Sequence, residues 1–242
     1  MVETAIVAGV GPAQGLGAVL ARRIAKDGLH VVVAGRTMEK LDAVAASIRA
    51  EGGAATPVVC DVTDEQQVIS LWNAAEAIGP VSLAIYNAGN NMPGKVSGMT
   101  SEFFERCWRV CTFGAFVFAR EASDHMSPRG QGTLIFTGAS ASMRGKEGFA
   151  AFTSAKGGLR NFAQSAAKEF GPLGIHVGHV VIDGAIDGEK IHTLLPQYAA
   201  QRSGEGRLID LSGIAEIYLQ LHGQPRAAWT FEVDVRTSAD PW

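Results

Sequence analysis

Residues 4–17, TAIVAGVGPAQGLG, carry the chain from a predicted strand into a predicted helix. The apolar run Thr4 to Ala8 is typical of a buried strand, and helical periodicity runs from Leu16 to Asp27. Small residues at such a junction let the backbone approach a pyrophosphate, which free N–H groups at the helix start can bind. The spacing is G-x-x-x-G-x-G, not the general dinucleotide fingerprint G-x-G-x-x-G, and a tight turn without a ligand is the alternative. The cofactor residues predicted in this loop are Gly11, Gln14, Gly15, Leu16 and Gly17.

The same alternation of apolar strand and longer helix continues along the chain. Strands that are this apolar belong in a parallel sheet covered on both faces, with right-handed crossovers. We therefore predict an α/β fold, a doubly wound Rossmann fold with a seven-stranded parallel sheet, as a single domain over residues 1–242. The predicted strands are residues 4–8, 30–34, 56–60, 81–86, 132–137, 175–182 and 229–235, and the predicted helices are residues 16–27, 39–50, 65–77, 102–123, 149–170 and 212–221.

Composition excludes several classes of partner. The chain has 242 residues, 47% of them hydrophobic, and a formal net charge of −3, and no basic run marks a nucleic-acid footprint. No apolar run approaches the roughly 20 residues needed to span a bilayer, and the first residues show no targeting pattern. We therefore expect a cytoplasmic protein that binds neither nucleic acid nor membrane.

The chain has three cysteines, an odd number that argues against a disulfide framework. Cys107 and Cys111 lie four residues apart on a predicted helix and so share one face. They are either two soft metal ligands or small buried apolar groups. Since no further ligand has a suitable spacing, we predict no metal site.

The end of the second strand bears on which nucleotide binds. Where an acid would bind the ribose 2′-hydroxyl of NAD, the chain has Arg36. A guanidinium grips a 2′-phosphate with paired charge-assisted hydrogen bonds, so Arg36 favours NADP(H) over NAD(H), a solvated surface arginine being the alternative. Asp61, at the end of the third strand, is placed to receive the adenine amino group or else to cap the next helix.

With these pieces in order, the chain resembles the short-chain dehydrogenase/reductase family over nearly its full length. The resemblance implies that Asn87, Ala88 and Gly89 support the sheet and lie against the cofactor, that Lys156 holds the nicotinamide ribose, and that Ser140 orients a substrate carbonyl. The features that carry it are Gly11, Gly15 and Gly17, the pair Asp61-Val62, the segment Asn87-Ala88-Gly89, and Ser140 followed by Lys156.

Three expected active-site features of the family are replaced. Phe152 stands four residues before Lys156, where the family has the tyrosine whose hydroxyl moves a proton. Cys111 stands where the family has an asparagine of the proton relay, and Ile182-Asp183 replaces the usual Pro-Gly pair. The cofactor-binding features remain, so the sequence predicts nucleotide binding more firmly than turnover.

Two explanations stay open. In the first, the protein is an oxidoreductase: NADPH delivers hydride, Ser140 and the Lys156 ammonium polarise the acceptor, and the proton comes from water or a substitute group. Asp183 is the preferred substitute, because a carboxylate at the carboxyl end of a strand is better explained by function than by packing. In the second, it is an inactive NADP(H)-binding sensor or assembly subunit. The other candidate donors are His179, Cys111, His192 and Tyr198.

The region 187–207 is expected to cover the substrate, with a partly apolar lining and glycines that permit opening. The substrate is expected to be a small molecule. The resemblance also implies a homodimer or homotetramer formed through the long helices, whereas the sequence alone supports an amphipathic helix whose phenylalanines are core. These phenylalanines are Phe149, Phe152, Phe162 and Phe170.

Overall fold

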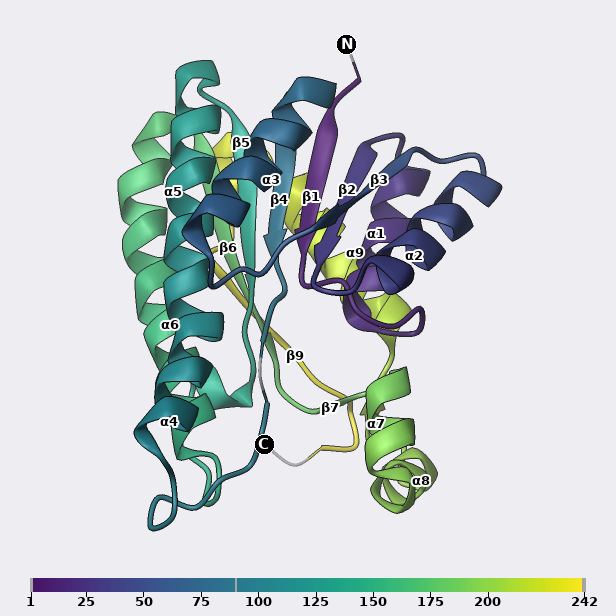
Figure 1. Ribbon diagram of the computed structural model, residues 1–242, viewed down its shortest axis with the longest axis vertical. Helices are drawn as coiled ribbons and strands as arrows, with labels where there is room; N and C mark the ends of the chain where they lie inside the picture. Colours follow the sequence, from purple (N-terminus) through teal and green to yellow (C-terminus); the bar gives the residue numbers. More distant parts are fainter. Residues whose placement is uncertain (1, 90, 241–242) are drawn as a thin grey trace.

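The computed structural model describes residues 2–89 and 91–240. Its centre is a parallel sheet of seven strands, as the sequence predicted, and the strands lie in the order β3-β2-β1-β4-β5-β6-β9 (Figure 1). The winding reverses at β1, where the chain returns to add β4 on the other side. The strands are β1 Thr4–Ala8, β2 His30–Gly35, β3 Ala55–Val59, β4 Val81–Tyr86, β5 Gly132–Thr137, β6 Ile175–Ile182 and β9 Glu232–Val235.

Helices cover both faces of this sheet (Figure 1). One face packs on α1 Leu16–Lys26, α2 Met38–Ala50 and α9 Leu211–His222. The opposite face packs on α3 Glu65–Ile78, α5 Gly114–Met126 and α6 Ala150–Phe170. Burying apolar side chains on both sides explains why the central strands are nearly continuous apolar runs and do not alternate with polar residues. No helix in the described ranges has the length and apolar character to cross a bilayer.

The edges of the sheet explain two local features of the sequence. Pro57 lies in β3, an edge strand that pairs only with β2 among the described strands. Proline cannot donate a ladder hydrogen bond, and an edge position tolerates this loss. The other edge, β9, is shorter than predicted, because residues 229–231 lie outside the strand and link it to a 3₁₀ turn at residues 226–228.

The long helix predicted over residues 102–123 is divided in the structure. It consists of α4 Ser101–Trp108, a π-helical turn Arg109–Phe113 that contains Cys111, and α5. Such turns are rare and occur often at functional sites. Periodicity did not reveal the division, because apolar residues continue through the turn from α4 into α5.

The region 187–207, predicted as a cover, forms two short helices, α7 Glu189–Leu194 and α8 Pro196–Gly204. A two-stranded sheet, β7 Ala185–Ile186 with β8 Leu208–Ile209, closes its base. In Figure 1, α7 and α8 lie on one side of the carboxyl ends of the strands and α4 lies on the other. The edge of the sheet where such folds bind ligands therefore lies between these helices.

Gly9, directly after β1, has a backbone that only glycine adopts at low cost. Its φ is +98°, and a Cβ there would lie 2.5 Å from the backbone nitrogen of Ala88. Gly28 has a similar φ of +91°, but a Cβ there would meet open space. Substitution of Gly28 would therefore cause backbone strain alone, whereas substitution of Gly9 would cause strain and a steric clash.

We expect Gly9→Ala to lower the free energy of unfolding by more than about 3 kcal/mol, because strain and a clash with rigid backbone add. Gly28→Ala carries the strain alone and should cost about 1–2 kcal/mol. Urea denaturation measures both. Equal costs at the two positions would contradict the close approach of the segments after β1 and β4.

Candidate functional site

The loop between β1 and α1 has the features that bind a pyrophosphate. Gly15 is the N-cap of α1 and supplies no side-chain cap, so the first N–H groups of the helix stay available to a ligand. A Cβ on Gly17 would lie 2.7 Å from the carbonyl oxygen of Gly9, so glycine lets the helix start this close to β1. The carbonyl of Gln14 accepts a 2.9 Å hydrogen bond from the N–H of Glu189 at the start of α7. The loop and the cover are thus in direct contact.

Arg36 and Asp61 lie at the ends of neighbouring strands. Arg36 is exposed after β2 and forms no hydrogen bond or ion pair with another residue in the described ranges. Asp61 accepts hydrogen bonds at Oδ1 from the backbone and hydroxyl of Thr63, at 2.9 and 2.8 Å. The cap of α3 is Asp64, so the capping alternative for Asp61 is wrong. The neighbouring Val62 is buried.

The Asn87 side chain joins the ends of three strands. Its Nδ2 donates to the carbonyl of Gly9 at 3.1 Å, and its Oδ1 accepts from the hydroxyl of Thr137 at 3.1 Å. Because Thr137 donates to Asn87, the Tyr218 hydroxyl, 2.7 Å away, donates to Thr137. Ala88 is buried beside this junction and Gly89 is exposed. The network fixes β1, β4, β5 and α9 relative to one another.

Lys156 is the buried cation of the site. Its side chain, on α6, is almost wholly covered, and Nζ donates a 2.6 Å hydrogen bond to the carbonyl of Thr137. No carboxylate pairs with it among the described residues, and burial lowers the pKa of the ammonium. A Cβ on Gly89 would lie 3.6 Å from Nζ. The ammonium therefore lies between the ends of β4 and β5.

Phe152 lies next to this cation. Its ring is buried, and Nζ of Lys156 lies 6.0 Å from the ring centre, at the limit of a cation–π contact. The ring also packs in a small apolar cluster with Cys107, Cys111 and Ala155. At the position where the family has a tyrosine, this chain therefore has the apolar ring of Phe152, next to Lys156.

The two cysteines are buried constituents of that cluster. A hydrogen bond with Cys111, together with burial, raises the pKa of the Cys107 thiol well above its usual range. Such thiols are neither reactive nucleophiles nor ready metal ligands. No group of three or more potential metal-ligating side chains occurs in residues 2–89 and 91–240.

The loop after β5 holds two serines in different roles. Ser140 begins a 3₁₀ turn, Ser140–Ser142, and within the described chain its hydroxyl has no hydrogen-bond partner. The Ser142 hydroxyl accepts from the N–H of Ala139 at 3.2 Å and lies 3.5 Å from Nε2 of His179. Ser140 is therefore available to a ligand, whereas Ser142 is used within the protein.

His179 extends this contact through the sheet. Its Nδ1 lies 2.9 Å from Oε2 of Glu232, whose carboxylate also receives a bidentate pair from Arg160 at 2.6 and 2.8 Å. Since Glu232 can only accept, Nδ1 carries the proton and Nε2 accepts from Ser142. Burial lowers the pKa of His179 to about 4, so the ring is neutral at pH 7. A neutral, internally bonded ring is a poor candidate for the proton donor.

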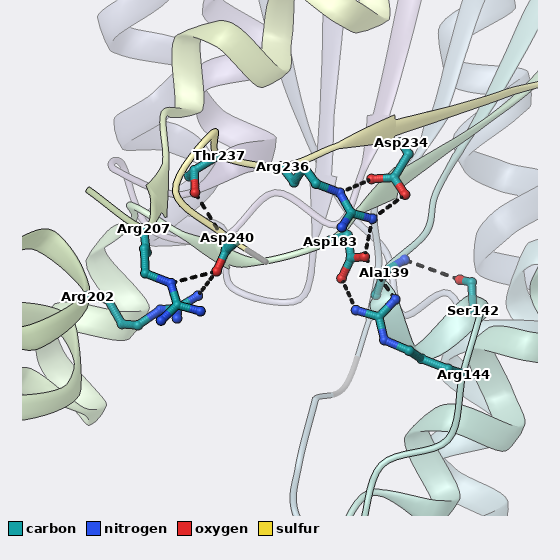
Figure 2. A network of polar contacts seen from close by, with 10 residues as sticks. All are labelled: Ala139, Ser142, Arg144, Asp183, Arg202, Arg207, Asp234, Arg236, Thr237 and Asp240. Carbon is teal, nitrogen blue, oxygen red and sulfur yellow. Dashed lines mark hydrogen bonds and ion pairs between the residues drawn. The ribbon is translucent and has the colours of Figure 1, made fainter. Parts of the chain in front are cut away.

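Asp183, the preferred donor from the sequence, is held by two arginines (Figure 2). Arg144 donates to both carboxylate oxygens, at 2.6 and 2.9 Å, and Arg236 donates to Oδ2 at 2.7 Å. The side chain of Asp183 is only 4% exposed. Both carboxylate oxygens are engaged by guanidinium donors, so the geometry fits an anchor for the two arginines better than a proton donor.

The remaining candidate donors lie on the cover. His192 pairs with Asp187 at 2.6 Å, and Tyr198 is exposed with the Arg202 guanidinium 5.8 Å from its ring centre. No hydrogen bond connects either of them with Ser140 or Lys156 in the described ranges. His192 lies in α7 and Tyr198 in α8, both within the region 187–207.

Comparison with known proteins agrees with this arrangement. The profile of the family described as short chain dehydrogenase matches residues 3–196. The chain is 30% identical to gluconate 5-dehydrogenase of Gluconobacter oxydans (strain 621H) over 69% of its length, and 31% identical to versicolorin reductase 1 of Dothistroma septosporum over 81%. These matches span 66% and 74% of the two relatives, so the chain corresponds to about two thirds of the first.

A solved short-chain dehydrogenase from Rhodopseudomonas palustris is 36% identical, with a TM-score of 0.83 over 97% of this chain and 98% of that one. The chain therefore belongs to the short-chain dehydrogenase family, as the motifs indicated. Its named relatives are dehydrogenases and reductases, which supports the prediction of an oxidoreductase.

Several polar residues of the site were not singled out from the sequence. They are Thr137, Tyr218, Glu232, Arg236 and Asp240. A threonine that directly follows the apolar run of β5 is a weak signal for Thr137. For the others no local pattern exists, because their partners lie tens of residues away in the chain.

The buried histidine makes a prediction about acid stability. The unfolded state binds a proton at His179 below pH 6.5, whereas the folded state does so only near pH 4. Its contribution to stability is complete above pH 6.5 and is lost as the pH falls toward 4, by roughly 3 kcal/mol. Urea denaturation of the wild type and of His179→Gln should show a shallower fall between these pH values in the variant. Parallel pH profiles would contradict a buried neutral His179.

Proposed function

We propose that this protein is an NADP(H)-dependent oxidoreductase that acts on a small molecule. The observation that carries the proposal is the buried Lys156 ammonium beside Gly89, at the same edge of the sheet as the uncapped start of α1. A cation buried without a carboxylate is costly, and a site that binds an anionic or polyhydroxyl ligand explains why it is kept.

The residues present fit the nucleotide. The first turn of α1 would hold the pyrophosphate with Gly11, Gln14, Gly15, Leu16 and Gly17 around it, and the exposed Arg36 would meet a 2′-phosphate. Asp61 and Val62 would receive the adenine, and Asn87, Ala88 and Gly89 would border the path toward Lys156. When bound, the cofactor supplies or accepts a hydride.

The protein's own contribution would be orientation and charge. The unpartnered Ser140 hydroxyl would donate a hydrogen bond to an acceptor oxygen, and the Lys156 ammonium would hold the ribose and stabilise negative charge that develops nearby. Phe152 supplies no proton. An acceptor that needs little acid catalysis, such as a quinone or an activated double bond, fits this site better than a simple ketone.

Asp183 has a positioning role in this proposal. Its two arginines join the loop that carries Ser140 to the ends of β6 and β9. The carboxylate would set the distance between that loop and the ends of β6 and β9, while the proton would come from water.

A second function has one observation in its favour, the apolar Phe152 ring buried against Lys156. An inactive NADP(H)-binding subunit would keep the nucleotide residues and lose the phenol.

We also propose a homodimer or homotetramer formed through the long helices. Such an assembly would cover Phe116, which is 43% exposed and packs edge-on against Phe162 of α6.

Calorimetric titration with NADPH and NADH tests the nucleotide preference. We expect NADPH to bind much more tightly, and Arg36→Ala to weaken NADPH binding by about 10–100-fold while leaving NADH unchanged, because a charge-assisted pair is lost. Lys26→Ala, which removes one positive charge from the other end of α1, is the matched control. Equal weakening by both variants would indicate a general charge effect and contradict a role for Arg36.

Phe152→Tyr separates the two functions. Restoring a hydroxyl beside Lys156 should raise the reduction of small ketones and diketones by about 10²–10⁴-fold, measured as loss of NADPH absorbance. Phe162→Tyr adds a hydroxyl elsewhere on α6 and should change nothing. If NADPH binds and Phe152→Tyr is no faster than Phe162→Tyr, the scaffold does not support carbonyl reduction.

A further inference from the structure

Two arginines of the cover hold a single carboxylate. Arg202 of α8 and Arg207, just before β8, donate from Nη2 and Nε to the same oxygen, Oδ1 of Asp240, at 2.8 and 2.9 Å (Figure 2). The hydroxyl of Thr237 donates to Oδ2 at 3.1 Å. The Asp240 side chain is 10% exposed. The covering segment therefore contains a half-buried pair of arginines that already holds an anion.

This carboxylate lies against the end of β6. A Cβ on Gly184 would be 3.3 Å from Oδ2 of Asp240 and 2.9 Å from Cδ1 of Ile209. Glycine at this position thus leaves just enough room for the carboxylate between the strand and the cover. Gly184 follows Asp183 at the carboxyl edge of the sheet, where folds of this class bind their ligands.

Asp240 does not accept hydrogen bonds from all the buried N–H groups of the two arginines. Nε of Arg202 is buried and has no hydrogen-bond partner among the described residues. Guanidinium and carboxylate groups pair best through two parallel hydrogen bonds, but both arginines here converge on one oxygen. A buried donor without a partner is costly, so the site suits a carboxylate that approaches at a different angle.

The segment that carries Asp240 is held by few bonds. Residues 237–240 follow β9 and add no strand to the sheet, and within them Asp240 donates its N–H to the carbonyl of Thr237 at 3.3 Å. Release of Asp240 would break its ion pairs and this turn, but no strand pairing. A ligand carboxylate in its place would restore the ion pairs, so the exchange has a small net cost.

We propose that Arg202 and Arg207 form a binding site for the carboxylate of a small-molecule ligand, and that Asp240 occupies it as an internal competitor. The proposal rests on the proposed function in one respect, because it names the substrate class as carboxylic acids. The region 187–207 is the predicted cover of the substrate. If it closes on a ligand carboxylate, the presence of two arginines in it is explained.

Removal of the internal carboxylate tests this. Gluconate and acetate are titrated calorimetrically into the wild type, Asp240→Ala and Asp240→Asn, without cofactor and again with NADPH. Sorbitol and acetamide serve as their uncharged counterparts. If Asp240 fills the site most of the time, its removal should tighten binding of at least one of the two anions at least about tenfold, because apparent affinity scales with the fraction of open site. The uncharged counterparts should show no gain.

Two further variants locate the effect. Glu205→Gln removes a different carboxylate from Arg207, one that pairs with Nη1 at 3.1 Å, and should leave anion binding as in the wild type. Adding Arg207→Gln to Asp240→Ala should abolish the gain. Circular dichroism confirms that each variant is folded, and Asp240→Asn keeps the shape of the side chain if the alanine variant is unstable.

The proposal is overturned if neither Asp240 variant binds gluconate or acetate more tightly than the wild type, or if sorbitol and acetamide gain equally. Asp240 would then be a permanent anchor of the cover. Absence of NADPH binding would instead contradict the proposed function, and the titrations without cofactor would still test the arginine pair.

Discussion

The hydrogen bonds of the Asn87 side chain are the constraint on which the site depends. Parallel strands bring their carboxyl ends to one edge, but they do not by themselves fix the loops that follow. Asn87 does so by donating to Gly9 after β1 and accepting from Thr137 at the end of β5, with Tyr218 of α9 behind it. These groups are largely buried, and each unmet hydrogen bond would cost about 1–3 kcal/mol, so the network has a single favourable arrangement.

Lys156 depends on that arrangement. Its ammonium is held by the carbonyl of Thr137, the residue whose hydroxyl bonds Asn87, so one residue connects the frame to the cation. Burial without a carboxylate partner lowers the pKa of the lysine and leaves its charge directed at whatever binds next to Gly89. The adjoining cluster of Phe152 and two cysteines keeps water from that side. Among the described residues, the site therefore places a buried cation beside apolar side chains. Under the function we propose, this favours hydride acceptors that need little proton transfer.

The rim of the site is organised by arginine–carboxylate contacts from distant parts of the chain. Arg144 and Arg236 fix Asp183 beside the Ser140 loop, and Arg202 and Arg207 hold Asp240 on the cover (Figure 2). The first carboxylate lies at the end of a sheet strand, so it is a fixed part of the frame. The second is on a turn without strand pairing, which is consistent with the exchange that we propose for it.

The sequence by itself determined the fold, the family and the place of the glycine-rich loop between β1 and α1, because these depend on local periodicity and on glycines at fixed spacing. The strands β4, β5 and β6 have the predicted bounds. Phe152 could be recognised as the replacement of the family's tyrosine because it stands four residues before Lys156 in the sequence. Only the tertiary structure decided the π-helical turn at Cys111 and the anchoring of Asp183. It also revealed the neutral His179 between Ser142 and Glu232 and the pairing of Asp240 with two arginines. The physical reason is that the charge state and role of a side chain depend on the partners and burial that the fold supplies, and those partners come from segments that no local pattern connects.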